Sequence, residues 1–262
     1  MGYDIVIPSG EALSVPTQTY VAPVGPPWTP ADTSVEAWYD ASNTDSITHI
    51  SGAVSAWNDL SGKNRHMEQT IEGDKPNTGT NTLNGLNVIN SDQDWMNASV
   101  PIGEFPTSIQ ITGVLKKTGT NNTYETFVTR SLGNYPAPLD VYNNRRFVGS
   151  GASFKSASST DIRGITSASI LSTLVSTADI KEWYNGVEVL TTTSTHYGDN
   201  ATVITIGSRN DGLTRFTGDW AEIVITFELS DEELYTLEGY LSHKWGVGMP
   251  IDHPYKDSAP TV

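Results

Sequence analysis

The hydrophobic and polar positions from Val35 onward alternate over short stretches that are separated by turn residues. This period of two is the pattern of β-strands with one buried face. The clearest predicted strands cover residues 109–115, 124–129, 203–207 and 221–227. Residues 181–190 predict a hairpin, because Asn185-Gly186 supplies the two positive φ values of a type I′ turn. A second hairpin is expected around residues 210–212. Many short strands with little helix predict an all-β sandwich.

One helix is expected near the C-terminal end. Ser230 and Glu233 form a capping box, in which each residue satisfies a backbone N–H of the first turn. Leu234, Leu237 and Leu241 follow at helical spacing and provide the apolar stripe. Gly246 then offers a left-handed stop. We expect this helix to pack across one edge of the sandwich and to have a structural role.

Residues 1–31 differ from the rest of the chain, because six of the 14 prolines lie there. Proline fixes φ and removes a backbone donor, so this segment is expected to be an extended arm, distinct from a domain at 32–262. The arm carries apolar side chains that gain from docking, either on its own domain or on a neighbouring protein. Those chosen as docking residues are Ile5, Ile7, Leu13, Val15, Tyr20 and Trp28. A disordered leader is the alternative interpretation.

Two segments far apart in the chain resemble one family. The first contains Trp38-Tyr39-Asp40 and Asp59-Leu60-Ser61-Gly62, and the second contains Gly218-Asp219-Trp220 and His243-Lys244-Trp245-Gly246. Together they resemble concanavalin A-like, laminin-G-like domains, over roughly residues 35 to 257. The resemblance implies a jelly-roll β-sandwich of two antiparallel sheets, in which the first and last strands are neighbours. With the helix and the arm, this is the expected fold.

Charge and composition narrow the possible functions. The net charge is −15, which opposes binding to nucleic acid or to an anionic membrane. There is no cysteine, hence no disulfide framework and no thiolate zinc site. No apolar run is long enough to cross a membrane. The first residues lack the basic and apolar regions of a signal peptide, so we expect none.

Carbohydrate binding is the usual activity of the family that the chain resembles, and sugars are held by aromatic faces with polar groups around them. The residues least committed to a core are chosen as weak candidates for such a site: Trp95, Trp183, Tyr135, Tyr142, Asn143 and Arg145. Trp38, Trp57, Trp220 and Trp245 lie inside the family-like segments and are expected in the core. For each candidate, a simple turn or packing role is the alternative.

A glycosidase needs two carboxylates held close together, and we expect no enzyme here. The strand motif of jelly-roll glucanases is absent, and Glu222 and Glu228 are six residues apart, too far along an extended strand. A calcium ion is the more credible inorganic partner, since calcium binds clusters of loop carboxylates. Asp59, Asp92 and Asp94 are the weak candidate ligands, although Asp also builds ordinary turns. No cofactor is required.

By resemblance and architecture together, the chain is expected to be a non-enzymatic bacteriophage virion protein. Such a decoration, head-fibre or tail-associated protein assembles in the host cytoplasm and needs no export signal. Its arm would bind capsid or tail proteins, and the jelly roll would face outward toward cell-surface glycans. The alternatives are a carbohydrate-binding module of a secreted bacterial surface protein, located outside the cell, and a divergent glycoside hydrolase. A homo-oligomer is left open, because no residue argues for a symmetry.

Overall fold

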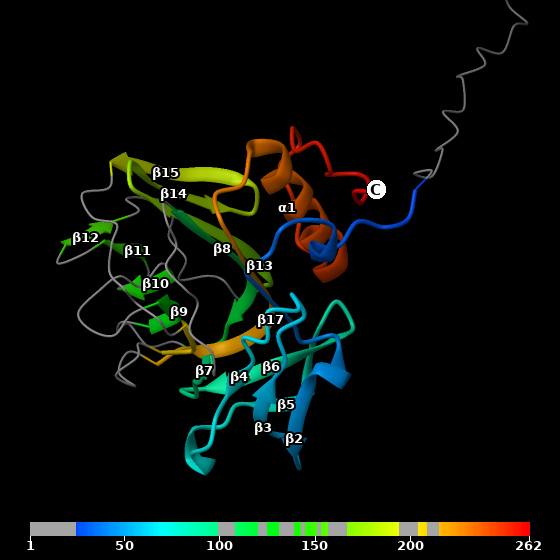
Figure 1. The fold of residues 1–262 in the computed structure, drawn as a ribbon, viewed down its shortest axis with the longest axis vertical. Coiled ribbons are helices and arrows are strands. Elements are labelled where there is room, and N and C mark those ends of the chain that lie inside the picture. Colours follow the sequence, from blue (N-terminus) through cyan, green and yellow to red (C-terminus); the bar gives the residue numbers. More distant parts are fainter. Residues whose placement is uncertain are drawn as a thin grey trace, which may run out of the picture.

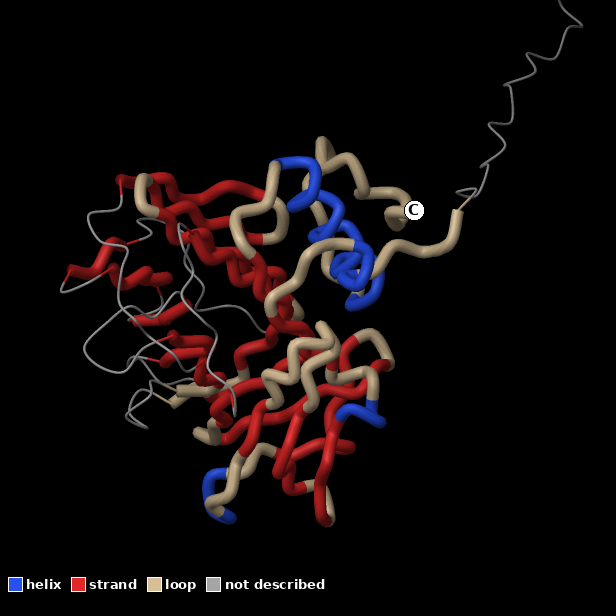
Figure 2. Tube along the Cα trace, viewed as in Figure 1, coloured by secondary structure: helices blue, strands red, loops and turns tan. Residues whose placement is uncertain are grey.

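A computed structural model describes residues 25–98, 108–119, 125–130, 139–142, 145–150, 153–156, 167–193, 204–208 and 215–262. This part of the chain is built of antiparallel strands, with one α-helix and three short 3-10 helices (Figures 1 and 2). The predicted all-β class is therefore confirmed. Within the described residues, no helix has the length and apolar character that crossing a membrane requires.

The strands are β1 (Ala37–Asp40), β2 (Ile47–Ile50), β3 (Ala53–Trp57), β4 (Met67–Glu68), β5 (Asn77–Leu83), β6 (Leu86–Asp92), β7 (Met96–Ala98), β8 (Ser108–Lys117), β9 (Glu125–Arg130), β10 (Leu139–Tyr142), β11 (Arg145–Ser150), β12 (Ser153–Ser156), β13 (Ser169–Ser176), β14 (Asp179–Tyr184), β15 (Val187–Thr193), β16 (Ile204–Ile206) and β17 (Thr217–Thr226). The helices are η1 (Pro30–Asp32), η2 (Thr44–Ser46), η3 (Glu72–Asp74) and α1 (Asp231–Trp245).

Two layers follow from the pairing of these strands. One layer has the order β15-β14-β13-β8-β17, and β17 then pairs with β6 through its first half and with β1 through its second half. β5 extends this layer beyond β6. The other layer has the order β2-β3-β4-β7-β16-β9-β10-β11-β12. The pairing of Ala53 with Asn77 joins the two layers. The first and last strands, β1 and β17, are neighbours, as expected.

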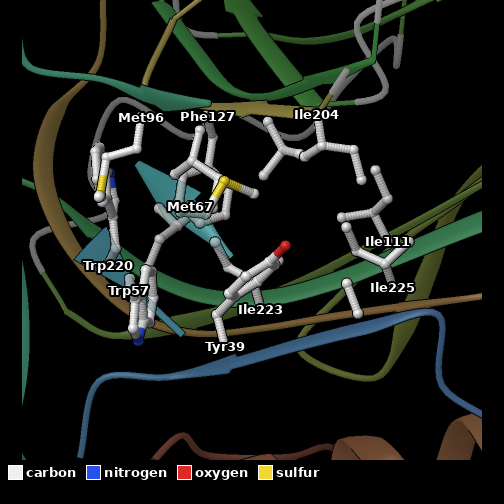
Figure 3. Close-up of a cluster of buried hydrophobic side chains, with 14 of the residues drawn as sticks. Tyr39, Trp57, Met67, Met96, Ile111, Phe127, Ile204, Trp220, Ile223 and Ile225 are labelled. Atoms are coloured by element: carbon white, nitrogen blue, oxygen red, sulfur yellow. The ribbon is translucent and has the colours of Figure 1, made fainter. Parts of the chain in front are cut away.

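The main core lies between the two layers (Figure 3). Strands alternate their side chains between faces, so Ile109 and Ile111 of β8 and Ile223 and Ile225 of β17 point into this core. Trp57 and Trp220 are fully buried there, as the sequence predicted. Aromatic pairs fix the packing, since the ring centroids of Tyr39 and Trp57 lie 5.6 Å apart.

α1 covers the outer face of the first layer, not the edge that we had expected (Figure 2). Its capping box is confirmed, because Ser230 accepts a hydrogen bond from the Glu233 backbone and Glu233 bonds the Ser230 N–H at 2.9 Å. Leu237 and Leu241 pack in one cluster with side chains of β8, β13 and β17. The helix ends at Gly246 with a φ of 69°, the left-handed stop that the sequence predicted.

The N-terminal arm divides at residue 25. Ile5, Ile7, Leu13, Val15 and Tyr20 lie outside the described residues, and their docking stays a prediction. Trp28 is only 9% exposed and meets the Tyr240 ring of α1 edge-on at 5.8 Å. Its backbone N–H bonds Pro260, and Pro27 pairs with Thr261. The end of the predicted arm is therefore part of the domain, docked on the domain's own helix.

The Asn185-Gly186 hairpin is confirmed, with φ values of 47° and 77° at these two residues. It joins β14 to β15. The second predicted turn, at residues 210–212, lies outside the described residues. The two segments that this turn was expected to join do meet, because the Phe216 N–H donates to the Gly207 carbonyl at 2.8 Å.

Candidate rim site and buried charge network

The connection from β6 to β7 forms a tight polar loop at one rim of the sandwich. Gln93 adopts a φ of 66°, which turns the chain back after Asp92. The Asp92 N–H donates to Asp94 Oδ2 at 2.9 Å, and the Asp94 N–H donates to Ser91 Oγ at 3.0 Å. The Ser91 hydroxyl in turn donates to the carbonyl of Phe216 at 2.9 Å, so this loop is tied to the chain that enters β17.

Arg215 links the loop to the turn at η3. Its Nη1 donates to Asp74 Oδ1 at 2.6 Å and to the Gln93 carbonyl at 3.1 Å. Sequence reasoning missed both Arg215 and Asp74. They are 141 positions apart, so no spacing in the sequence connects them. Only the folding of both segments to the same rim brings the guanidinium to the loop.

Trp95 is held in place at this rim by its backbone. Its N–H donates to the Asp74 carbonyl at 3.3 Å, and its carbonyl accepts from Gln69 Nε2 at 2.7 Å. The side chain is half-buried, and the indole N–H has no hydrogen-bond partner among the described residues. Aromatic side chains with a few polar groups around them are common at small-molecule binding sites. We call Asp74, Asp92, Asp94, Trp95 and Arg215 the rim cluster.

The rim cluster is acidic, with three carboxylates and one guanidinium. Burial raises the pKa of Asp94 to about 6. The neighbouring charges of Asp92 and Asp74 raise this pKa further, whereas the Asp92 N–H and Arg215 lower it. The excess of negative charge favours neutral or cationic groups over anionic ones as ligands at this rim.

Asp59 lies in a separate turn. Its Oδ1 accepts the N–H groups of Trp38 and Ser61, both at 2.9 Å. Its Oδ2 accepts the Ser61 hydroxyl at 2.7 Å and the Arg65 N–H at 3.0 Å. Because donors occupy both oxygens, this carboxylate serves the turn that follows β3. Among the residues that the structure describes, no three acidic or histidine side chains gather closely enough to hold a metal ion. Calcium binding at Asp92 and Asp94 stays a prediction.

The other candidate sugar-binding residues fall elsewhere. Trp183 is only 8% exposed and packs with Leu174 and Leu234 beneath α1, so the expectation of an open stacking ring is corrected. The helix buried it, which the sequence around the Asn-Gly turn did not reveal. Tyr142 of β10 is paired in register with Arg145 of β11, so both residues are in strands and not in the expected loop. Tyr135 and Asn143 lie outside the described residues.

A second polar cluster lies between β1, β17 and α1. Glu222 is fully buried, and its carboxylate accepts from Trp38 Nε1 at 2.8 Å, Trp245 Nε1 at 2.7 Å and the Tyr240 hydroxyl at 3.0 Å. Lys244 Nζ bridges Glu222 at 2.7 Å and Asp40 at 2.6 Å. Burial raises the pKa of Glu222, and Lys244 opposes this.

This charge network joins the residues on which the family resemblance rested. Its role is structural, because it fastens the helix to the first and last strands. The four donors around Glu222 leave its carboxylate no open face for a substrate. Trp245 is buried as expected, and Trp38 is half-buried, with its indole N–H used in the network.

No family model matches the chain, and no curated protein matches it. Solved structures do share its fold. The binding domain of botulinum neurotoxin DC in complex with rat synaptotagmin II is 14% identical, with a TM-score of 0.55 over 81% of this chain and 52% of that one. Domain 4 of AbnA, an extracellular arabinanase of Geobacillus stearothermophilus, in complex with arabinotriose, is 13% identical, with a TM-score of 0.51 over 78% of this chain and 98% of that one.

The chain spans about half the length of the neurotoxin binding domains that it matches. At these identities the likeness concerns the fold alone. It agrees with the two antiparallel layers described above, and this chain has the β-sandwich fold of those binding domains.

Proposed function

We propose that this chain is a non-enzymatic, carbohydrate-binding β-sandwich domain and that it binds through the rim cluster. The observation that carries the proposal is the partly exposed position of Trp95, whose backbone is held by the Asp74 carbonyl and the Gln69 side chain. Asp92, an exposed residue of the same loop, supplies acceptors for hydroxyl groups.

The structural neighbours support a binding role. The arabinanase domain was solved with arabinotriose, and the neurotoxin DC binding domain was solved both with SialylT and with a protein, rat synaptotagmin II. These ligands belong to those proteins. For this chain, the negative charge of the rim cluster favours a neutral glycan, because a sialylated one would meet three carboxylates.

The test is a glycan array probed with the full chain, with Trp95→Ala and with Tyr235→Ala. Tyr235 is an exposed aromatic residue on α1 and serves as the matched control. We expect Trp95→Ala to lose binding and Tyr235→Ala to keep it. The proposal is contradicted if the wild type binds no neutral glycan on the array, or if both variants bind equally.

We further propose that the domain is a laminin-G-like jelly roll displayed on a bacteriophage particle, with residues 1–24 as its attachment. The support is the composition of that segment, which carries Pro8, Pro16 and Pro23 and apolar side chains such as Ile5, Ile7 and Leu13. The alternative is a carbohydrate-binding module of a secreted bacterial surface protein, for which these residues are dispensable.

Truncation separates these two functions. A chain that starts at Gly25 keeps Trp28 and its contacts with α1, so it should fold as the full chain does. Both chains are supplied during assembly of phage particles, and their incorporation is measured by co-sedimentation with the particles. Attachment through residues 1–24 predicts incorporation of the full chain only. Glycan binding by both chains with incorporation of neither favours the secreted module.

A further inference from the structure

The C-terminal segment, residues 250–262, lies on α1 and is drawn in red beside it in Figure 1. This segment holds the end of the predicted arm. Pro27 pairs with Thr261, and the Trp28 N–H donates to the Pro260 carbonyl at 3.1 Å. We call this pairing the terminal clip. A movement of the C-terminal segment therefore also moves the clip, next to the point at which the arm joins the domain.

Few side chains of this segment are buried. Within residues 250–262 only His253 and Pro260 are buried, and none of these residues joins the apolar clusters beneath α1. A polar contact ties the segment to the helix, because His243 Nε2 donates to the Tyr255 carbonyl at 2.8 Å. The helix itself is anchored by its leucines and by the buried charge network. Parts with little apolar burial open locally at low free energy, so the segment should open before the helix does.

A buried pair of titratable groups lies between the segment and α1. His253 Nε2 is 3.6 Å from Glu238 Oε2, longer than a hydrogen bond, and the two side chains are 1% and 0% exposed. His253 Nδ1 accepts the Tyr255 N–H at 3.2 Å, so a neutral ring carries its proton on Nε2, on the side of Glu238. Within the described part of the chain, neither oxygen of Glu238 has a hydrogen-bond partner.

An ionised carboxylate is costly in such a place, because no donor replaces the water that it loses. Burial raises the pKa of Glu238, and the neighbouring His253 lowers it in part. The other titratable groups beside His253 are Tyr235, whose ring meets it edge-on at 5.4 Å, and Tyr255, at 6.3 Å. The β14–β15 hairpin approaches His253 with Gly186, which brings no charge.

We propose that Glu238 and His253 form a pH-operated latch, which keeps the C-terminal segment on α1 and thereby keeps the terminal clip closed. While Glu238 is protonated, the buried site holds no negative charge and the segment stays in place. When Glu238 ionises, its carboxylate is stabilised by contact with water, which requires the segment to lift from the helix. The clip then opens and releases the end of the arm. This regulation is independent of glycan binding at the rim cluster.

The direction of the pH dependence follows from linkage. Closing the segment raises the pKa of Glu238 above the value that it has when open to water, about 4.3. The contribution of this carboxyl to closing is complete below that value and is lost as the pH rises through the closed-state pKa. Because one proton is involved, the opening equilibrium should increase by up to about tenfold per pH unit above the closed-state pKa.

The test is amide hydrogen exchange of the full chain, followed by NMR at several pH values and corrected for the intrinsic exchange rate. The Trp28 N–H reports on the clip, since its acceptor is the Pro260 carbonyl. The Glu36 N–H, bonded to the Ile225 carbonyl of β17 at 2.7 Å, reports on the body of the sandwich. We expect the protection of Trp28 relative to Glu36 to fall as the pH rises.

Two variants assign the effect to the buried carboxyl. Glu238→Gln keeps the shape of the side chain and cannot ionise, so the relative protection of Trp28 should no longer change with pH. The matched control is Glu232→Gln, an exposed glutamate of the same helix, which should behave as the wild type. The proposal is overturned if the relative protection in the wild type is constant with pH, if it falls equally in Glu238→Gln, or if Trp28 and Glu36 lose protection together.

Discussion

Replacing Lys244 by methionine tests whether the buried charge network fastens α1 to the sandwich. The change removes the cation that bridges Glu222 and Asp40 and keeps most of the apolar side-chain volume. Glu222 is fully buried and would remain with Asp40 as a pair of carboxylates without a counter-charge. Removing one partner of a buried ion pair costs about 3–5 kcal/mol.

The lower end of that range applies here, because the Lys244 side chain is 17% exposed. We therefore expect the free energy of unfolding to fall by about 3 kcal/mol. At about 2–4 °C per kcal/mol for a domain of this size, the midpoint of thermal unfolding should fall by about 6–12 °C. The control is Lys256→Met, whose ion pair with Asp257 is exposed and is worth about 0.5 kcal/mol.

The loss of stability in Lys244→Met should also depend on pH. The pKa of Glu222 is raised by burial and held down by Lys244, so Lys244→Met raises it further. A carboxyl with a raised pKa stabilises the fold below its unfolded-state pKa and loses this contribution as the pH rises through its folded-state pKa. The variant should therefore be weakest at neutral and alkaline pH and approach the wild type as the pH falls toward about 4.

The assay is thermal and urea unfolding of the wild type, Lys244→Met and Lys256→Met from acidic to neutral pH. Two results would refute the reasoning. One is a loss in Lys244→Met no larger than in Lys256→Met, which would mean that the network contributes nothing net. The other is a loss that does not shrink on acidification, which would mean that stranded carboxylates are not its cause.

Four further predictions concern the rim cluster and the packing of α1 on the first layer. Gly207→Ala should lower the free energy of unfolding by about 2 kcal/mol or more in urea, because its Cβ would lie 2.4 Å from the Asp94 carbonyl oxygen. The control is Gly62→Ala, also at positive φ but in open space, which should lower it by about 1 kcal/mol. Trp183→Ala should cost about 3 kcal/mol by the same measurement, since the ring is buried under α1, and a much smaller loss would contradict that burial. Burial raises the pKa of Asp94, so the wild type should lose stability as the pH rises from 3.8 to about 6. Asp94→Asn should not show this loss, and matching pH profiles of the two proteins would count against the prediction. If calcium binds at Asp92 and Asp94, the midpoint of thermal unfolding should be higher in excess Ca²⁺ than in chelator. Asp92→Asn should abolish this difference, and equal midpoints in the wild type would disprove calcium binding.

The sequence determined the features that depend on neighbouring residues. The Asn185-Gly186 turn and the capping box of Ser230 and Glu233 formed as predicted, because backbone dihedral angles and local hydrogen bonds decide both. The all-β class also followed, because alternation with a period of two reports one buried face of each strand. Trp57 and Trp220 were expected in the core because they lie inside the segments that resemble the laminin-G-like family, and both are buried there.

Tertiary structure decided what distant segments do to one another. Trp183 beside a hairpin turn looked available for a ligand, but α1 covers it, and the position of a helix over a sheet is set by packing far along the chain. Arg215 and Asp74 became a pair at the rim across 141 positions. Asp59 was a candidate cation ligand from its place in a polar turn, and the fold gives its carboxylate donors from Ser61 in that turn and from Trp38, 21 positions away. Local pattern fixes which face of a strand is buried, whereas exposure and charge pairing depend on which segments the fold brings together.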